Sequence, residues 1–279
     1  MNYSRKIIDR FLYGLMIFAS AAVGTALIGI IVYILVQSAG MLKLSVIFGS
    51  VGNGMLPMIV STAWTVFVSL VLALPIGIMT AIYLREYALK AGIRRSLGLA
   101  IDTLAGIPSI VYGLFGLLVF CRNLKLGQSI IAGGLTLTIM ILPVIIRTTE
   151  EALKTVPASF REGSLSLGAT KFQTILHVVL PPALPGILTA AILAAGRVVG
   201  ESAPVLFTLG TAINFPKSIF ETGRTLTIHL FYLTKEALKP DDFANAFTAA
   251  AVLIILVFIL NTVVKLIGKS FGNSGENLE

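Results

Sequence analysis

Long apolar runs without a charged residue dominate the chain. They cover Phe11–Leu42, Leu44–Leu84, Thr103–Cys121, Leu126–Ile146 and Phe243–Val264. Each exceeds the roughly 18 residues that an α-helix needs to cross the hydrocarbon layer of a membrane. Together with one more apolar stretch that carries an arginine, they predict six membrane-spanning helices and no strands, at about 11–36, 58–84, 97–121, 128–147, 183–209 and 244–266. We therefore expect an all-α, polytopic membrane protein.

The second apolar run is too long for one helix, so we expect Gly52, Asn53, Gly54 and Pro57 to break it outside the membrane. The first run follows Arg5, Lys6 and Arg10 but is longer than the apolar core of a cleaved signal peptide, so it is expected to remain as a span. No internal repeat is evident, which argues against transporters built from inverted repeats.

Composition agrees with this interpretation. Of 279 residues, 56% are hydrophobic and only 12% are charged, and the mean hydropathy is +0.95. These values exclude a soluble enzyme, a nucleic-acid-binding protein and a disordered chain. The single cysteine, Cys121, has no partner for an internal disulfide, and no Cys/His cluster has the spacing of a metal site.

Positive charge predicts the orientation in the membrane. If the N-terminus is inside, most of the 21 lysine and arginine residues fall in cytoplasmic segments. We therefore expect both termini in the cytoplasm of a prokaryote and the protein in its plasma (inner) membrane. The connection 148–182 is then cytoplasmic, and the connection 211–243 is external and contains a short helix within Thr225–Ala237.

The cytoplasmic connection carries a long, regularly spaced motif. Glu162-Gly163-Ser164 is followed after three residues by Gly168 and after nine more by Val178-Val179-Leu180-Pro181. Pro157 suits a first helical turn, Gly168 suits the positive φ that ends a helix, and Thr170 suits an N-cap. A helix–glycine–helix unit of this kind can offer Leu165 and Phe172 to a partner, although an ordinary amphipathic loop has a similar composition.

The motif resembles the EAA signature of ABC-importer permeases, with Gly163 and Ser164 in place of two alanines. That resemblance implies coupling to a separate ATPase through Glu162, Gly163, Ser164, Leu165, Gly168, Phe172, Leu180 and Pro181. The chain itself has no Walker A motif, because Gly268-Lys269-Ser270 lacks the earlier glycine, where Val263 stands. No cofactor is expected in this chain, and Mg-ATP is expected in the partner.

Two ionisable residues fall inside the predicted fifth span. Arg197 is expected near mid-depth, where an arginine is costly, and Glu201 one helical turn further on the same face. Pro204 is expected to loosen the helix at Gly200. The pair is either a structural ion pair or an anion-binding group, since a guanidinium fork matches an oxyanion.

Hydroxyl groups in neighbouring spans are further candidates for an anion pathway, although such groups often bond to their own backbone. They belong to Ser61, Thr62, Thr65, Ser69, Ser109 and Tyr112. Asp102 is expected to pair with a basic residue rather than line a pathway. His177 and His229 are interpreted as structural.

Three further stretches resemble the permeases of phosphate ABC importers. They are LPIGIMTAIYLREYA (74–88), LAGIPSIVYGLFG (104–116) and GRVVGESAPVLFTL (196–209), the last typical of the A-type subunit. The resemblance implies a type I (MetI-like) importer half-channel in which Arg197 is important for transport. It also implies a C-type permease subunit, two ATPase subunits and an extracytoplasmic phosphate-binding protein as partners, with membrane lipid around the spans and no nucleic acid.

We therefore expect an N-terminal helix and linker (1–54), a permease domain (55–268) and a cytoplasmic tail (269–279). The expected function is inward transport of inorganic phosphate, driven by ATP hydrolysis elsewhere, so the chain is not itself an enzyme. Three alternatives remain open: a permease for molybdate, sulfate or phosphonate; an ATP-independent channel or secondary transporter; and an assembly or sensor scaffold without flux.

Overall fold

The computed structural model describes residues 3–40, 47, 49, 54–88, 91–236 and 240–272. This part of the chain is helical and contains no strand. The α-helices are α1 (Tyr3–Ser38), α3 (Leu56–Ile82), α4 (Ala91–Ala105), α5 (Ser109–Gly116), α6 (Ile130–Lys154), α7 (Ala158–Ser166), α8 (Lys171–Thr174), α9 (Leu180–Gly200), α10 (Ala203–Thr208), α11 (Leu226–Glu236) and α12 (Pro240–Gly272). Three π-helical segments are η1 (Tyr83–Tyr87), η2 (Leu117–Asn123) and η3 (Ile175–Val179).

Five helical segments within the described residues are long and apolar enough to span a membrane, and a bent pair of helices makes a sixth. The five are Asp9–Ser38, Leu56–Tyr87, Ile130–Lys154, Lys171–Gly200 and Phe243–Leu266. The predicted all-α fold with up to six spans is therefore confirmed. The expected short helix in the 211–243 connection is also present, as α11.

The third predicted span, 97–121, is not one continuous helix. α4 and the α5–η2 segment meet at an angle of 96°. Pro108, with ψ of 140°, stands at the break and begins α5 as its N-cap. A proline has no backbone N–H for the preceding turn and its ring clashes there, so α4 ends and the chain starts again in a new direction.

The fifth predicted span also differs at both ends. Helix continues from Lys171 through η3 into α9, so the span does not start after Pro181 and Pro182, at the predicted residue 183. The prolines lie in the first turn of α9, directly after the π-helical turn, where the hydrogen-bond ladder is already interrupted. At the other end α9 stops at Gly200 instead of continuing to residue 209.

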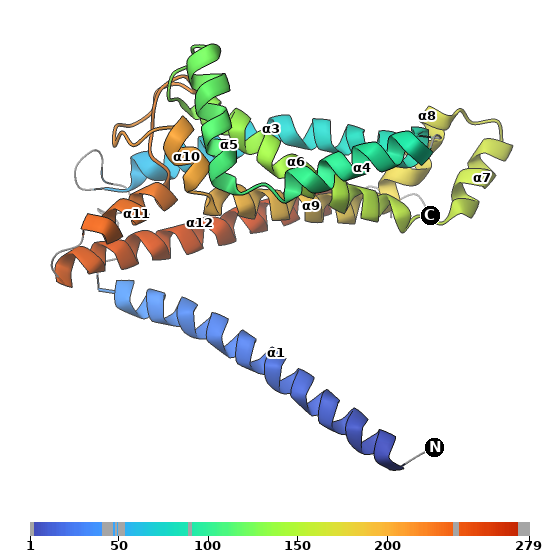
Figure 1. The fold of residues 1–279 in the computed structure, drawn as a ribbon, viewed down its shortest axis with the longest axis horizontal. Helices are drawn as coiled ribbons and strands as arrows, with labels where there is room; N and C mark the ends of the chain where they lie inside the picture. The colour runs from blue at the N-terminus through green and yellow to red at the C-terminus, as the bar shows by residue number, and fades with distance from the viewer. Residues whose placement is uncertain are drawn as a thin grey trace.

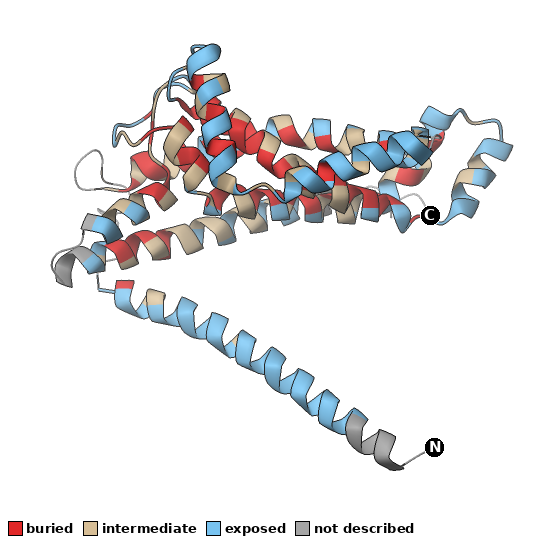
Figure 2. Cartoon of the chain, in the orientation of Figure 1, coloured by how far each residue is buried: buried red, intermediate tan, exposed pale blue. Residues whose placement is uncertain are grey.

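The core is built around α3, α6 and α9 (Figures 1 and 2). α3 and α6 approach closely at glycines: a Cβ on Gly134 would stand 2.5 Å from Val68 Cγ1, and one on Gly77 would stand 2.6 Å from Ile145 Cγ2. Ser69 Oγ donates to the Gly134 carbonyl at 3.2 Å across the same contact. Small residues and interhelical hydroxyl bonds are the usual means of helix packing in a membrane, where apolar burial gives little net gain.

α1 lies apart from this core and is exposed along nearly its whole length (Figure 2). Its contact with the rest of the molecule is mainly to α12, where the rings of Tyr33 and Phe247 pack edge to face at 5.6 Å. In Figure 1 the start of α1 and the end of α12 lie toward the same end of the molecule as α7. Of the expected break at Gly52–Gly54, only Gly54 belongs to the described residues, and residues 273–279 of the expected tail also lie outside them.

Candidate functional site

Arg197 and Glu201 meet at the carboxyl end of α9. Arg197 lies in the last turn of the helix, and Glu201 follows it as the C-cap with φ −78° and ψ 136°. Arg197 Nε lies 3.7 Å from Glu201 Oε1, which is an ion-pair distance but too long for a hydrogen bond. The side chains are 35% and 18% exposed. The expected pair, one helical turn apart, is present, although α9 ends at Gly200, between the two residues.

Pro204 explains why the helix breaks after Gly200, and neighbouring residues stabilise the break. Pro204 occupies the first turn of α10 and has no N–H to offer to the carbonyl of Gly200, so the helix ends there instead of loosening. The exposed carbonyls at a helix carboxyl end favour a nearby cation, and Arg197 provides it. The Glu201 carbonyl accepts a hydrogen bond from Thr227 Oγ1 at 3.0 Å, which ties the break to α11.

α5 packs against the helix that follows this break. A Cβ on Gly113 would stand 2.9 Å from Pro204 Cα, so the two backbones meet at a distance that only glycine allows. Tyr112 is buried, donates to the Leu104 carbonyl at 2.7 Å and is close enough to Arg197 for an electrostatic interaction. The half-buried Ser109 begins the same helix. The structure thus brings Tyr112 toward Arg197.

The four predicted hydroxyl residues of α3 are buried, and most of them form hydrogen bonds. Thr62 donates to Met58 O at 2.7 Å and accepts from the Leu226 amide at 3.0 Å, so it joins α3 to α11. Thr65 and Ser69 each bond to the carbonyl four residues earlier. Ser61 Oγ is the buried hydroxyl of this row that lacks a partner in the described part of the chain.

The EAA-like segment forms a projecting hairpin of helices (Figure 1). α7 ends before Gly168, whose φ is +84°, and α8 begins with a capping box between Thr170 and Gln173. Both predictions are confirmed, whereas Pro157 is the N-cap of α7 and not a residue of its first turn. Ser164 Oγ and Thr174 Oγ1 lie 2.9 Å apart and join the two helices.

Most of the predicted coupling residues face outward. Leu165 and Phe172 are 49% and 66% exposed, and the neighbouring Leu167 is 90% exposed. Glu162, Gly163 and Pro181 are also exposed, while Ser164 and Leu180 are half-buried. Phe172 in addition lines a hollow of about 520 Å³ with apolar residues of α3, η1, η3 and α9.

The sequence analysis missed the ion pair that holds this hairpin. Arg161 donates to Glu86 Oε1 from Nε at 3.1 Å and from Nη2 at 2.9 Å. The same guanidinium donates to the carbonyls of Val156 at 2.7 Å and Leu153 at 2.9 Å. The two side chains are only 17% and 10% exposed. The sequence signal was an arginine adjoining the motif and a lone glutamate just after the second span.

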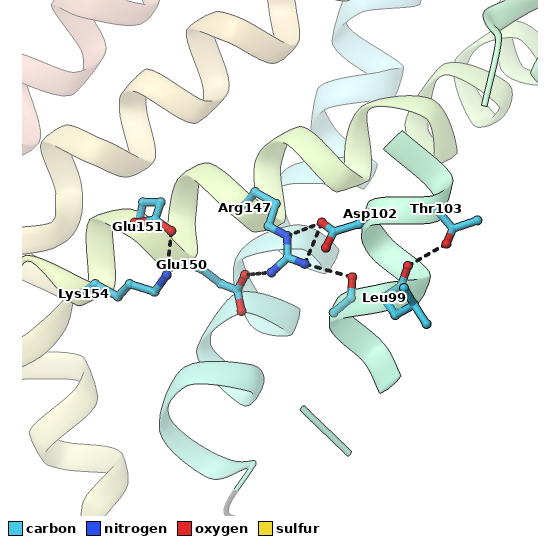
Figure 3. Close-up of polar contacts among 8 residues, drawn as sticks. Leu99, Asp102, Thr103, Arg147, Glu150, Glu151 and Lys154 are labelled. Carbon is cyan, nitrogen blue, oxygen red and sulfur yellow. Dashed lines mark hydrogen bonds and ion pairs between the residues drawn. The ribbon is translucent and has the colours of Figure 1, made fainter. Parts of the chain in front are cut away.

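A second arginine, Arg147, joins α4 to α6 (Figure 3). Its Nη2 lies 2.7 Å from Asp102 Oδ1 and 2.9 Å from the Gly98 carbonyl, and its Nη1 lies 2.7 Å from Glu150 Oε2. The expected pairing of Asp102 with a basic residue is therefore confirmed. Lys154 forms a separate, exposed pair with Glu151 at 2.6 Å.

His229 is half-buried in α11, and desolvation, followed by the nearby charge of Arg224, lowers its pKa to about 4. Its Nδ1 has no hydrogen-bond partner among the described residues. His177 Nδ1 lies 3.1 Å from the Gln173 carbonyl, one turn earlier. Within the described residues, no group of three or more His, Cys, Asp or Glu side chains is placed to hold a metal ion.

Residues 73–273 match the family of binding-protein-dependent transport system inner membrane components. The chain belongs to this family. It is 33% identical over 283 residues, 95% of its own length and 96% of the relative's, to the probable ABC transporter permease protein YqgI of Bacillus subtilis. It is 40% identical to the phosphate transport system permease protein PstA 1 of Mycobacterium tuberculosis, over 70% of this chain and 64% of that protein.

Two solved structures share the fold of this chain. A bacterial ABC transporter that imports the acidic polysaccharide alginate superposes with a TM-score of 0.69 at 16% identity, covering 95% of this chain and 99% of that one. The inward-facing MetNI methionine ABC transporter gives a TM-score of 0.60 at 22% identity, covering 78% and 94%. The protein is thus a PstA-like, multi-pass membrane permease of the type I ABC-importer fold, and a subunit of this kind is not itself an enzyme.

Proposed function

We propose that the protein is the A-type permease subunit of an importer that moves inorganic phosphate inward across a prokaryotic plasma membrane. The observation that carries this proposal is Arg197, placed beside Glu201 at a helix break in a chain that is 40% identical to a phosphate permease. The open carbonyls of the break and the carboxylate of Glu201 weaken the hold of Arg197 on an anion. A passing oxyanion is therefore bound weakly enough to be released.

The pathway in this proposal passes Arg197 and Glu201 and includes the hydroxyls of Tyr112, Ser109, Ser61 and Thr62. Ser61 is favoured as a hydrogen-bond donor, because its buried hydroxyl has no partner among the described residues. Ser109 is included because it begins α5, the helix that carries Tyr112. The Thr62 hydroxyl already makes two hydrogen bonds, so it contributes by joining α3 to α11 beside the pathway.

The assembly in this proposal contains a C-type permease subunit, two ATPases that bind Mg-ATP, and an extracytoplasmic phosphate-binding protein. The exposed α7–α8 hairpin, with Leu165 and Phe172 outward, serves as the coupling element for one ATPase. Both termini and this hairpin then lie in the cytoplasm.

The test is uptake of labelled phosphate at micromolar concentration by cells that lack this chain, with and without the chain restored, and with labelled sulfate as the control anion. Restored phosphate uptake supports the proposal. Restored uptake of sulfate, molybdate or phosphonate instead would show that the same mechanism acts on another oxyanion. Structural relatives of the same fold import different substrates. Uptake that persists when ATP is depleted contradicts the ATP-driven mechanism.

Arg197→Ala is expected to lower uptake at least about a hundredfold, because loss of a charged hydrogen-bond donor to the anion costs about 3 kcal/mol. The assembly should still form, since the ion pair of Arg197 with Glu201 is long, at 3.7 Å. Arg122→Ala, an exposed arginine in η2, is the matched control and should transport normally. Normal uptake by Arg197→Ala would make Arg197 a structural residue only.

A further inference from the structure

A separate concentration of positive charge lies at the end of the bundle that carries α7 and α8. A hollow of about 570 Å³ opens there between η1, the start of α4 and the end of α6. Its walls include five cationic residues and one carboxylate, namely Arg85, Arg94, Arg95, Arg147, Lys154 and Glu150. The hollow therefore attracts anions, and it is distinct from the region around Arg197.

Two of the cations are already neutralised. Arg147 holds both Asp102 and Glu150 at 2.7 Å, and Lys154 holds Glu151 at 2.6 Å. Arg85 also interacts electrostatically with Glu151, but Glu151 accepts its hydrogen bond from Lys154.

The other three cations have no such partner. Arg85, Arg94 and Arg95 are exposed and form no ion pair with any carboxylate among the described residues. A compact group of three arginines repels itself electrostatically unless an anion lies between them.

The walls of the hollow are held in place by the paired cation. Arg147 joins α6 to α4 through Asp102 (Figure 3) and through the Gly98 carbonyl. Both residues lie one to two turns after Arg94 and Arg95. This contact fixes α4, which carries Arg94 and Arg95, against the end of α6. The wall of the hollow is therefore held at the level of the backbone.

We propose that this hollow binds a phosphate group, supplied either by the headgroup of an anionic membrane lipid or by inorganic phosphate. Guanidinium groups bind phosphate oxygens through paired hydrogen bonds, and basic pockets between membrane helices retain lipid phosphates. α4 begins at Ala91 in the wall of the hollow, so its first N–H groups add partial positive charge. The site does not depend on which substrate the permease transports.

The test uses the full chain in its assembly, in the Arg197→Ala background so that a pathway site does not bind the probe. One arm measures retention of phosphatidylglycerol, against phosphatidylcholine, by native mass spectrometry. The other arm measures binding of inorganic phosphate to the same assembly in phosphatidylcholine nanodiscs. The variants are Arg94→Gln, Arg95→Gln and the triple variant that includes Arg85→Gln, with Arg122→Gln as the matched control at a distant exposed site.

Each single variant is expected to weaken binding of the phosphate probe about tenfold, and the triple variant more than a hundredfold. Arg122→Gln should bind as the parent does. Weakening in the lipid arm assigns the site to a lipid headgroup, and weakening in the phosphate arm assigns it to the free anion.

A charge-retaining variant, Arg94→Lys with Arg95→Lys, should keep part of the affinity and controls for loss of fold. Unchanged binding in both arms by the triple variant would overturn the proposal, and so would an equal loss in Arg122→Gln. Neither arm measures transport, so failure here leaves the proposed transport function untouched.

Discussion

Replacement of Arg161 by methionine tests whether the α7–α8 hairpin is held rigidly to the bundle. In the native chain the Arg161 guanidinium donates two hydrogen bonds to Glu86 Oε1 and one each to the carbonyls of Val156 and Leu153. Methionine preserves the apolar stem but leaves the Glu86 carboxylate, with a side chain only 10% exposed, without its cation.

The magnitude follows from this burial. Removal of one partner of a buried ion pair typically costs about 3–5 kcal/mol, because the remaining charge is left uncompensated. Glu86→Gln should cost less, about 1–2 kcal/mol, since an amide oxygen still accepts a hydrogen bond from Arg161. The double variant Arg161→Met with Glu86→Gln should be less unstable than the sum of the single variants.

The assay combines the thermal midpoint of the purified assembly with the ratio of ATP hydrolysed to substrate transported. Arg161→Met should lower the midpoint and raise that ratio, because a loosened hairpin transmits less of the ATPase motion to α9. Lys154→Met is the matched control, since it breaks the exposed pair with Glu151, whose side chain is 69% exposed. Exposed pairs contribute about 0–1 kcal/mol. An equal effect of the two variants would refute the reasoning.

Two other changes give further checks. Gly168→Val forces a β-branched residue into φ +84°, which costs about 1–2 kcal/mol of backbone strain, and should weaken co-purification of the ATPase. Gly24→Val in the exposed α1 is the control and should leave co-purification unchanged. Full ATPase yield with Gly168→Val would contradict the proposed role of the hairpin. His229 has a pKa of about 4 in the fold against about 6.5 unfolded, so the unfolded chain binds more protons between these values and stability should fall by about 1–2 kcal/mol from pH 7 to pH 5. His229→Gln should remove that part of the pH dependence of the thermal midpoint, and an unchanged slope would show that His229 is not the group responsible.

The features that the sequence predicted correctly are those decided within a few residues or by hydropathy alone. Apolar length decides whether a helix can cross a membrane, so most spans were found. Gly168 and Thr170 were assigned correctly because a positive φ and an N-cap depend on the residue itself and on its near neighbours. The family resemblance rested on motifs of the same local kind.

Tertiary structure decided what depends on residues far apart in the chain. Hydropathy averages over a window and does not register a change of direction, so the 96° bend at Pro108 and the helix end at Gly200 were missed. Glu86 and Arg161 are 75 positions apart, and Asp102 and Arg147 are 45 apart, so no local pattern joins them. The arginine-lined hollow likewise exists only because η1, the start of α4 and the end of α6 lie side by side, which packing at Gly77 and the contacts of Arg147 bring about.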